Sequence, residues 1–153
     1  MIRKNRARSS SLFLMELILA ILFFSITSAV CIQFFVKSHL LSQDSQILTH
    51  AVNECSAAAE MCSTSDSSAA ALGTLVKLYP DADKDLLKNS VTVYYTEDFK
   101  PCKAESGIYS LNVILSENDT MLNAAISFTD EKDKKSVYNL NTSHHIARRA
   151  GNE

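Results

Sequence analysis

Glu16 places a carboxylate in the apolar run from Leu12 to Val36, where it needs a partner of opposite charge. An ionised carboxylate in a membrane span costs about 2.5–3.5 kcal/mol, and such groups usually pair with an opposite charge. No Lys, Arg or His occurs within the run, so we expect the partner to come from outside it. The alternative is that Glu16 lies at the interfacial end of the span, where a carboxylate costs little.

The cysteines offer a second kind of chemistry. Cys31 lies in the apolar run, and Cys55, Cys62 and Cys102 follow it. On one continuous helix Cys55 and Cys62 lie about 10 Å apart along the axis, whereas a disulfide needs Cα atoms closer than about 7 Å. The candidate bridge therefore joins Cys102 to Cys62 or to Cys55. Three free thiols are the alternative, since an odd number leaves one cysteine unpaired in either case.

Motifs for metal binding or catalysis are weak. The carboxylates of residues 81–85 alternate as in a calcium loop, but Leu86 stands where the loop needs Gly and Thr92 where it needs Glu. Two adjacent histidines, His144 and His145, would point to opposite sides of an extended strand. The sequence contains no HExxH, GxSxG or CxxC motif and no Gly-rich phosphate loop. We therefore expect no catalytic residues, no metal, no cofactor and no enzyme activity.

A long helix must position Glu16 and the first cysteines. The twenty residues from Leu17 to Val36 contain no charge, Gly or Pro, and as a helix they span a hydrocarbon core of roughly 30 Å. After Val36, apolar residues recur every three or four positions as far as Cys62, and the first Gly is Gly73. The pattern predicts one helix from about Leu12 to about Cys62, apolar all round in its first half and one-sided in its second.

The remainder predicts a small α+β head. A second helix is expected over residues 69–79, capped by Asp66, Ser67 or Ser68 and ended by Pro80. Beyond it the apolar period drops to two, which indicates three to four antiparallel strands packed on the long helix. The expected strands are Val91–Tyr95, Ile108–Leu115, Leu122–Phe128 and Val137–Leu140. An exposed tail is expected from about Asn141.

The charge distribution sets the expected topology. The first eleven residues carry four positive charges, whereas the whole chain carries -2. Basic residues before an apolar span stay in the cytoplasm, so we expect a single-pass membrane protein with its C-terminal domain outside the cytoplasm. No basic stripe follows the leader, which argues against nucleic-acid binding.

The expected domains are a leader (1–11), a membrane half of the helix (12–36), a head (37–142) and a flexible tail (143–153). A secretory signal ending at Ala29 is the alternative.

The N-terminus resembles that of type IV prepilins and pseudopilins. The matching features are the basic leader, the small residue Ser11, the apolar residue Leu12, and a carboxylate, Glu16, at the head of a long apolar helix. The resemblance covers about residues 1–36 in sequence, and the rest of the chain only in layout. The family normally carries Gly at the position of Ser11.

The resemblance implies cleavage by a prepilin peptidase between Ser11 and Leu12, methylation, and assembly through the N-terminal helices. Glu16 would then neutralise the free amine of a neighbouring subunit's Leu12. The implied partners are other pilin-like subunits, the peptidase, membrane lipid and an inner-membrane assembly platform. The implied role is a minor subunit of a type IV pilus or a type II secretion-type machine, and the implied location includes a cell-surface filament. The alternative is an uncleaved single-pass membrane protein with an extracytoplasmic α+β binding domain.

Overall fold

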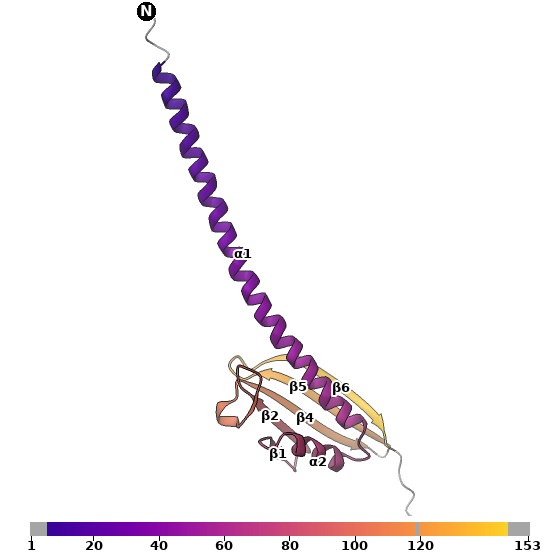
Figure 1. Ribbon diagram of the computed structural model, residues 1–153. Coiled ribbons are helices and arrows are strands. Elements are labelled where there is room, and N and C mark those ends of the chain that lie inside the picture. Colours follow the sequence, from indigo (N-terminus) through magenta and orange to yellow (C-terminus); the bar gives the residue numbers. More distant parts are fainter. Residues whose placement is uncertain (1–5, 119, 147–153) are drawn as a thin grey trace, which may run out of the picture. The chain divides into compact units, whose positions relative to one another are not determined.

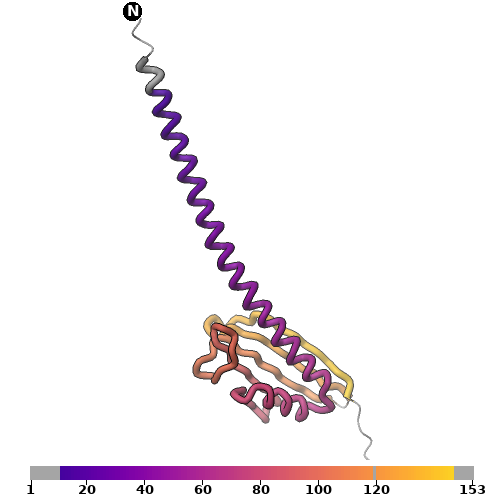
Figure 2. Tube along the Cα trace, viewed as in Figure 1, coloured from indigo at the N-terminus to yellow at the C-terminus, as the bar shows by residue number. Residues whose placement is uncertain are grey.

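The computed structural model of the chain describes residues 6–118 and 120–146, with side chains from Ser11 onward. It divides into two compact units, Met1–Asp44 and Ser45–Glu153, which are described separately below. We call residues 11–44 of the first unit, whose side chains the structure describes, the stem, and the second unit the head. Figures 1 and 2 follow the chain through both.

The long helix predicted from the sequence is present. Helix α1 runs from Arg6 to Ser63 and contains no Gly or Pro. Its continuity has a plain cause, because nothing in this stretch removes a backbone N–H or favours a left-handed residue. The stem is helical throughout, and the head begins with the last nineteen residues of the same helix, Ser45–Ser63.

The head is built on one antiparallel sheet, in the order β1-β2-β4-β5-β6, with β3 also paired to β2 (Figure 1). The strands are β1 (Asp83–Asp85), β2 (Ser90–Tyr95), β3 (Pro101–Cys102), β4 (Tyr109–Asn118), β5 (Met121–Asp130) and β6 (Lys135–His145). A 3-10 turn, η1 (Ala104–Ser106), separates β3 from β4. The α+β class and the helix-on-sheet architecture are confirmed.

The sheet is larger than predicted, with six strands in place of three or four. The two additional strands, β1 and β3, are three and two residues long, too short to show an alternating pattern. The expected exposed tail from Asn141 is also wrong as far as the structure describes it, because β6 continues to His145 and Ile146 is buried. Residues 141–145 (NTSHH) are polar on both faces of the strand, so the sequence showed no apolar alternation there. Residues 147–153 of the predicted tail lie outside the described residues.

Small side chains hold α1 close to the sheet. Ala51, Cys55, Ala58 and Cys62 recur every three or four residues and are all essentially inaccessible to solvent. They face the inner side of the sheet, which supplies Val91, Val93, Tyr95, Tyr109, Leu111, Val113, Leu115, Leu122, Ala124, Ile126 and Phe128. Because alanine and cysteine are short, the larger strand side chains fill the space between helix and sheet.

The second helix closes the same core from one side. Helix α2 runs from Ser68 to Leu78 and buries Ala71, Leu72 and Leu75. Ser67 is its N-cap, as one of the three predicted choices, and its hydroxyl accepts a hydrogen bond from the N–H of Ala70 at 3.2 Å. Such caps satisfy N–H groups that the helix itself leaves unpaired.

Candidate functional site

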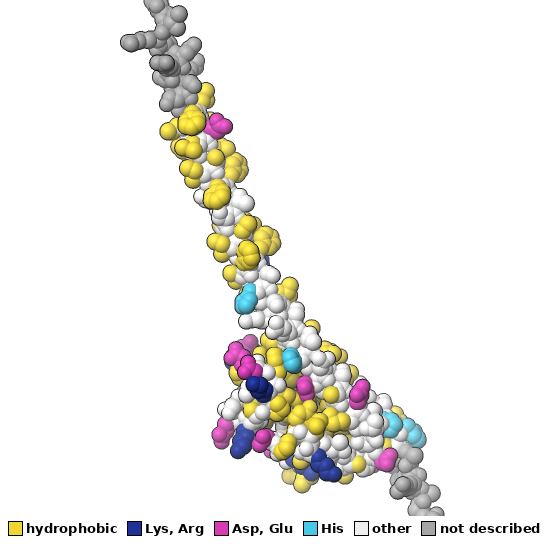
Figure 3. Space-filling view, viewed as in Figure 1, with side chains coloured by type: hydrophobic (Ala, Val, Ile, Leu, Met, Phe, Trp, Pro, Cys, Tyr) yellow, Lys and Arg dark blue, Asp and Glu magenta, His cyan; other side chains and the backbone are white. Residues whose placement is uncertain are grey.

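The stem is the part of the chain that the sequence singled out, and from Leu17 to Val36 it contains no charged side chain. From Ser11 to Val36 every side chain except Ser28 is exposed within this unit, including those of Phe24 and Phe35. Hydrophobic side chains dominate the visible face of the upper part of this unit (Figure 3). Such a surface is unfavourable in water and is compatible with a membrane setting.

The polar side chains of the stem are compatible with that setting. The hydroxyls of Ser25 and Thr27 donate hydrogen bonds to the carbonyl oxygens of Ile21 and Phe23, at 2.9 and 2.6 Å. These bonds satisfy both hydroxyls inside the helix, which lowers the cost of placing them in hydrocarbon. By length and composition, α1 contains one segment able to cross a membrane.

The predicted junction and carboxylate lie at the start of this exposed helix. Ser11, Leu12 and Glu16 are all helical and exposed. Among the described residues the salt bridges join Lys88 to Asp85 and Lys134 to Glu131, so Glu16 has no charged partner there. Its registration role, and cleavage between Ser11 and Leu12, remain predictions.

The structure does not bring the predicted disulfide partners together. Cys62 is buried near the end of α1, and Cys102 is partly exposed on β3, where it pairs with Tyr94 of β2. Both are free thiols, as are Cys31 and Cys55. Burial raises the pKa of the Cys62 thiol to about 11, which keeps it protonated and unreactive at neutral pH. The bridge remains a prediction, and the geometry accords with its alternative, free thiols.

A carboxylate on α1 links three elements of the head. The hydroxyls of Tyr79 and Tyr95 each donate a 2.8 Å hydrogen bond to Oε2 of Glu54. Tyr79 ends α2 and Tyr95 ends β2, so one oxygen atom connects α1 to both. Burial, followed by the hydrogen bond to Glu54, raises the pKa of Tyr79 to about 12, and burial also raises the pKa of Tyr95. Both phenols therefore stay protonated as donors.

Sequence reasoning treated Glu54 as one of many polar residues on the helix, so this cluster was missed. The position of Glu54 in the sequence could have indicated the cluster. Glu54 directly precedes the buried Cys55 and stands three residues after the buried Ala51. A carboxylate at the edge of a buried stripe is expected to find donors on the facing element.

A stacked series of aromatic rings leads from the surface of α1 into the core. The ring of Phe99 lies parallel to His50 of α1, with centroids 4.0 Å apart, and to Tyr109, at 5.3 Å. The series continues from Tyr109 to Phe128 and from Phe128 to Tyr95, each at 5.8 Å. Phe99 has a left-handed φ of 56°, which is uncommon for a bulky residue. The two stacked neighbours offset the cost of that conformation.

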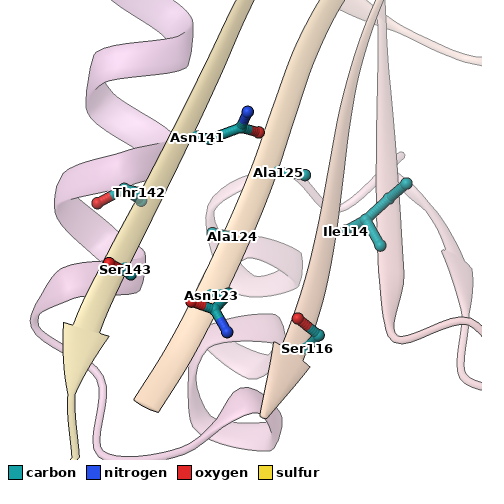
Figure 4. Close-up of a pocket in the computed structure, with 8 residues that line it drawn as sticks. All are labelled: Ile114, Ser116, Asn123, Ala124, Ala125, Asn141, Thr142 and Ser143. Carbon is teal, nitrogen blue, oxygen red and sulfur yellow. The ribbon is translucent and has the colours of Figure 1, made fainter. Parts of the chain in front are cut away.

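The outer face of the sheet, away from α1, carries a hollow of about 280 Å³. Two cross-strand rows form it, Ile114–Ala125–Asn141 and Ser116–Asn123–Ser143, as the register of β4, β5 and β6 requires (Figure 4). The small Ala125 in the first row creates the depression. The polar groups around it are hydroxyls and amides, which form hydrogen bonds but do not titrate near neutral pH.

Comparisons with protein-family models, with curated proteins and with solved structures each find no match.

Proposed function

We propose that this chain is a pilin-like or pseudopilin-like structural subunit, anchored in the membrane by its stem and assembled through it. The observation that carries the proposal is the exposed apolar surface of the stem, on a helix whose last turns are buried against the sheet of the head. An apolar helix of this length suits lipid before assembly and a bundle of similar helices after it. The role proposed is structural, not catalytic.

Processing belongs to the same proposal. A prepilin peptidase on the cytoplasmic side would cut between Ser11 and Leu12, removing the basic leader. Glu16 would then pair with the new amine of Leu12 on a neighbouring subunit, which offsets the cost of a carboxylate in the span. The head would lie outside the cytoplasm, and an assembly platform in the membrane would collect the stems into a type IV pilus or a type II secretion-type structure.

Loss of the Glu16 carboxylate tests the assembly step. We expect Glu16→Ala to insert into the native membrane normally but to migrate as a single subunit after mild detergent extraction, whereas the wild type migrates in a larger complex. Glu60→Ala is the matched control, because Glu60 is an exposed acidic residue on the part of α1 that belongs to the head. A large complex that persists unchanged in Glu16→Ala would contradict the proposed role of Glu16 in assembly.

A second candidate is an uncleaved single-pass membrane protein whose head binds a partner. Ser11 favours it, because the resembling family carries Gly at that position. The two candidates share the anchored topology and differ in whether the leader is removed.

A further inference from the structure

The two edges of the sheet differ in how they are protected against pairing with another chain. On one side, the outer edge of β2 is covered by β1, whose three residues are all charged, and by β3, which contains Pro101. Short, charged and proline-containing strands are the usual means of blocking an edge. On the other side β6 is eleven residues long and contains one charge, Lys135, and no Gly or Pro.

The free hydrogen-bonding groups of β6 follow from its register. The N–H of Ile146 donates to the carbonyl of Thr120 at 2.9 Å, continuing the β5–β6 register in which Met121 faces His145. Hydrogen-bonded pairs alternate along an antiparallel ladder. The even-numbered residues of β6 therefore bond to β5, and Asn139, Asn141 and Ser143 direct their N–H and C=O groups to the outer edge. Among the described residues no strand pairs with that edge.

The edge is regular over most of its length. The register shift lies between Phe128 and Thr129 of β5, near the start of β6, so Tyr138–His145 forms an uninterrupted ladder. An edge without a bulge in this stretch can accept a further strand without distortion.

The two faces of β6 define what such a strand must carry. Tyr138 and Leu140 belong to the core side and stay partly exposed. Asn139, Asn141 and Ser143 alternate with them and belong to the polar outer face, where Asn141 and Ser143 line the hollow (Figure 4). A strand added here would cover Tyr138 and Leu140 with its own apolar residues and continue the uncharged polar face with alternate ones.

We propose that the outer edge of β6 binds an extended segment of a partner protein by strand addition, with apolar residues at alternate positions and uncharged polar residues between them. The outward N–H and C=O groups of β6 form an extended row, and only another extended strand can form hydrogen bonds with all of them. The partner segment must therefore be an extended strand. The proposal concerns the head alone and stands whether or not the leader is cleaved.

A synthetic peptide with the sequence of β5, residues 121–130, tests the proposal, since this chain itself pairs that sequence with β6. Amide hydrogen exchange is measured on the full chain in detergent micelles, with and without the peptide. We expect the peptide to slow exchange at Asn139, Asn141 and Ser143, whose N–H groups are free. Leu140 and Thr142, already bonded to β5, should change little.

The variant Asn141→Pro removes one outward N–H and leaves the bonds to β5 in place, so it should weaken peptide binding about tenfold or more. Asn141→Ala is the matched control, because it loses the same side chain but keeps the N–H, and it should bind as the wild type does. Protection at Thr142 reports whether the variant is folded. If Asn141→Pro unfolds, Asn139→Pro replaces it in the same comparison.

Three results would overturn the proposal. The first is peptide addition that leaves the exchange of the odd-numbered amides unchanged. The second is binding that is equal in the proline and alanine variants. The third is protection of these amides in the protein alone together with a dimeric mass, which would assign the edge to a second copy of the chain.

Discussion

At the scale of single residues, Glu54 accounts for how α1, α2 and β2 are held in one arrangement. Its Oε2 accepts hydrogen bonds from two phenols that come from different elements. Hydrogen bonds to charged groups contribute about 1.5–3 kcal/mol each, and removing one partner leaves the others incompletely satisfied. The cluster is therefore a structural connection, and its geometry needs no ligand to explain it.

The same cluster predicts a loss of stability in alkali. The pKa of Tyr79 is raised to about 12, above the value of about 10 expected in the unfolded chain. The folded state thus holds this proton more tightly, so its contribution is complete below pH 10 and is lost as the pH rises toward 12. We expect the denaturant midpoint to fall across that interval, and tyrosinate absorbance to show that Tyr79 and Tyr95 ionise above the pKa of about 10 expected in the unfolded chain.

Tyr79→Phe is the control for this titration. It should remove one late-ionising group and reduce the alkaline loss of stability. Ionisation of Tyr79 and Tyr95 near pH 10, with the sheet still folded, would show that Glu54 does not hold the two phenols as the structure indicates.

At the scale of elements, two glycines provide a matched pair of substitutions. A Cβ on Gly107 would lie 2.7 Å from Cδ1 and 2.9 Å from Cβ of Tyr94, whereas a Cβ on Gly73 would meet nothing within 4 Å. Gly107→Ala must therefore displace Tyr94 or the turn that follows η1, and overpacking of this kind costs about 1–3 kcal/mol.

Gly73→Ala should have the opposite effect, because Gly73 lies inside α2 and alanine is the better helix former by about 1 kcal/mol. Chemical denaturation of both variants in the same detergent measures the two changes. Equal effects, or destabilisation by Gly73→Ala, would contradict the packing described around these positions.

Periodicity explains which elements could be predicted from the sequence. The absence of Gly and Pro before Gly73 indicated α1, and alternating apolar residues indicated β2, β4 and β5 with nearly correct ends. The patterns failed where the signal was too short or too polar. Strands β1 and β3 contain three and two residues. In the second half of β6 every residue is polar, so no alternation of apolar and polar residues marks the strand.

The candidate sites divide in the same way. Glu16 could be identified from one residue, because a carboxylate in an apolar run is conspicuous. The Glu54 cluster, the hollow around Ala125 and the free edge of β6 depend on which strands are neighbours, and the local sequence contains no information on pairing. Ala125 is a case in point, since an alanine forms a depression only because Ile114 and Asn141 flank it.

At the scale of the whole molecule, the chain combines a stem that needs an apolar environment with a head that buries its own core. The stem exposes large apolar side chains along its whole length, while the head has a core cluster of its own. The stem requires an apolar environment, whereas the head is stabilised by its own core. This organisation is expected of a subunit that is anchored by its stem and exposes its head to solvent.

The measurement that tests this account most directly is the intact mass and N-terminal residue of the protein taken from its native membrane. The account predicts a chain that begins at Leu12, eleven residues shorter than the sequence, with its amine free or methylated. A chain that retains Met1 or begins at Ile2 would contradict processing and favour the uncleaved anchored protein. A chain that begins at Val30 would contradict the stem itself, because the apolar segment would then have served as a signal peptide.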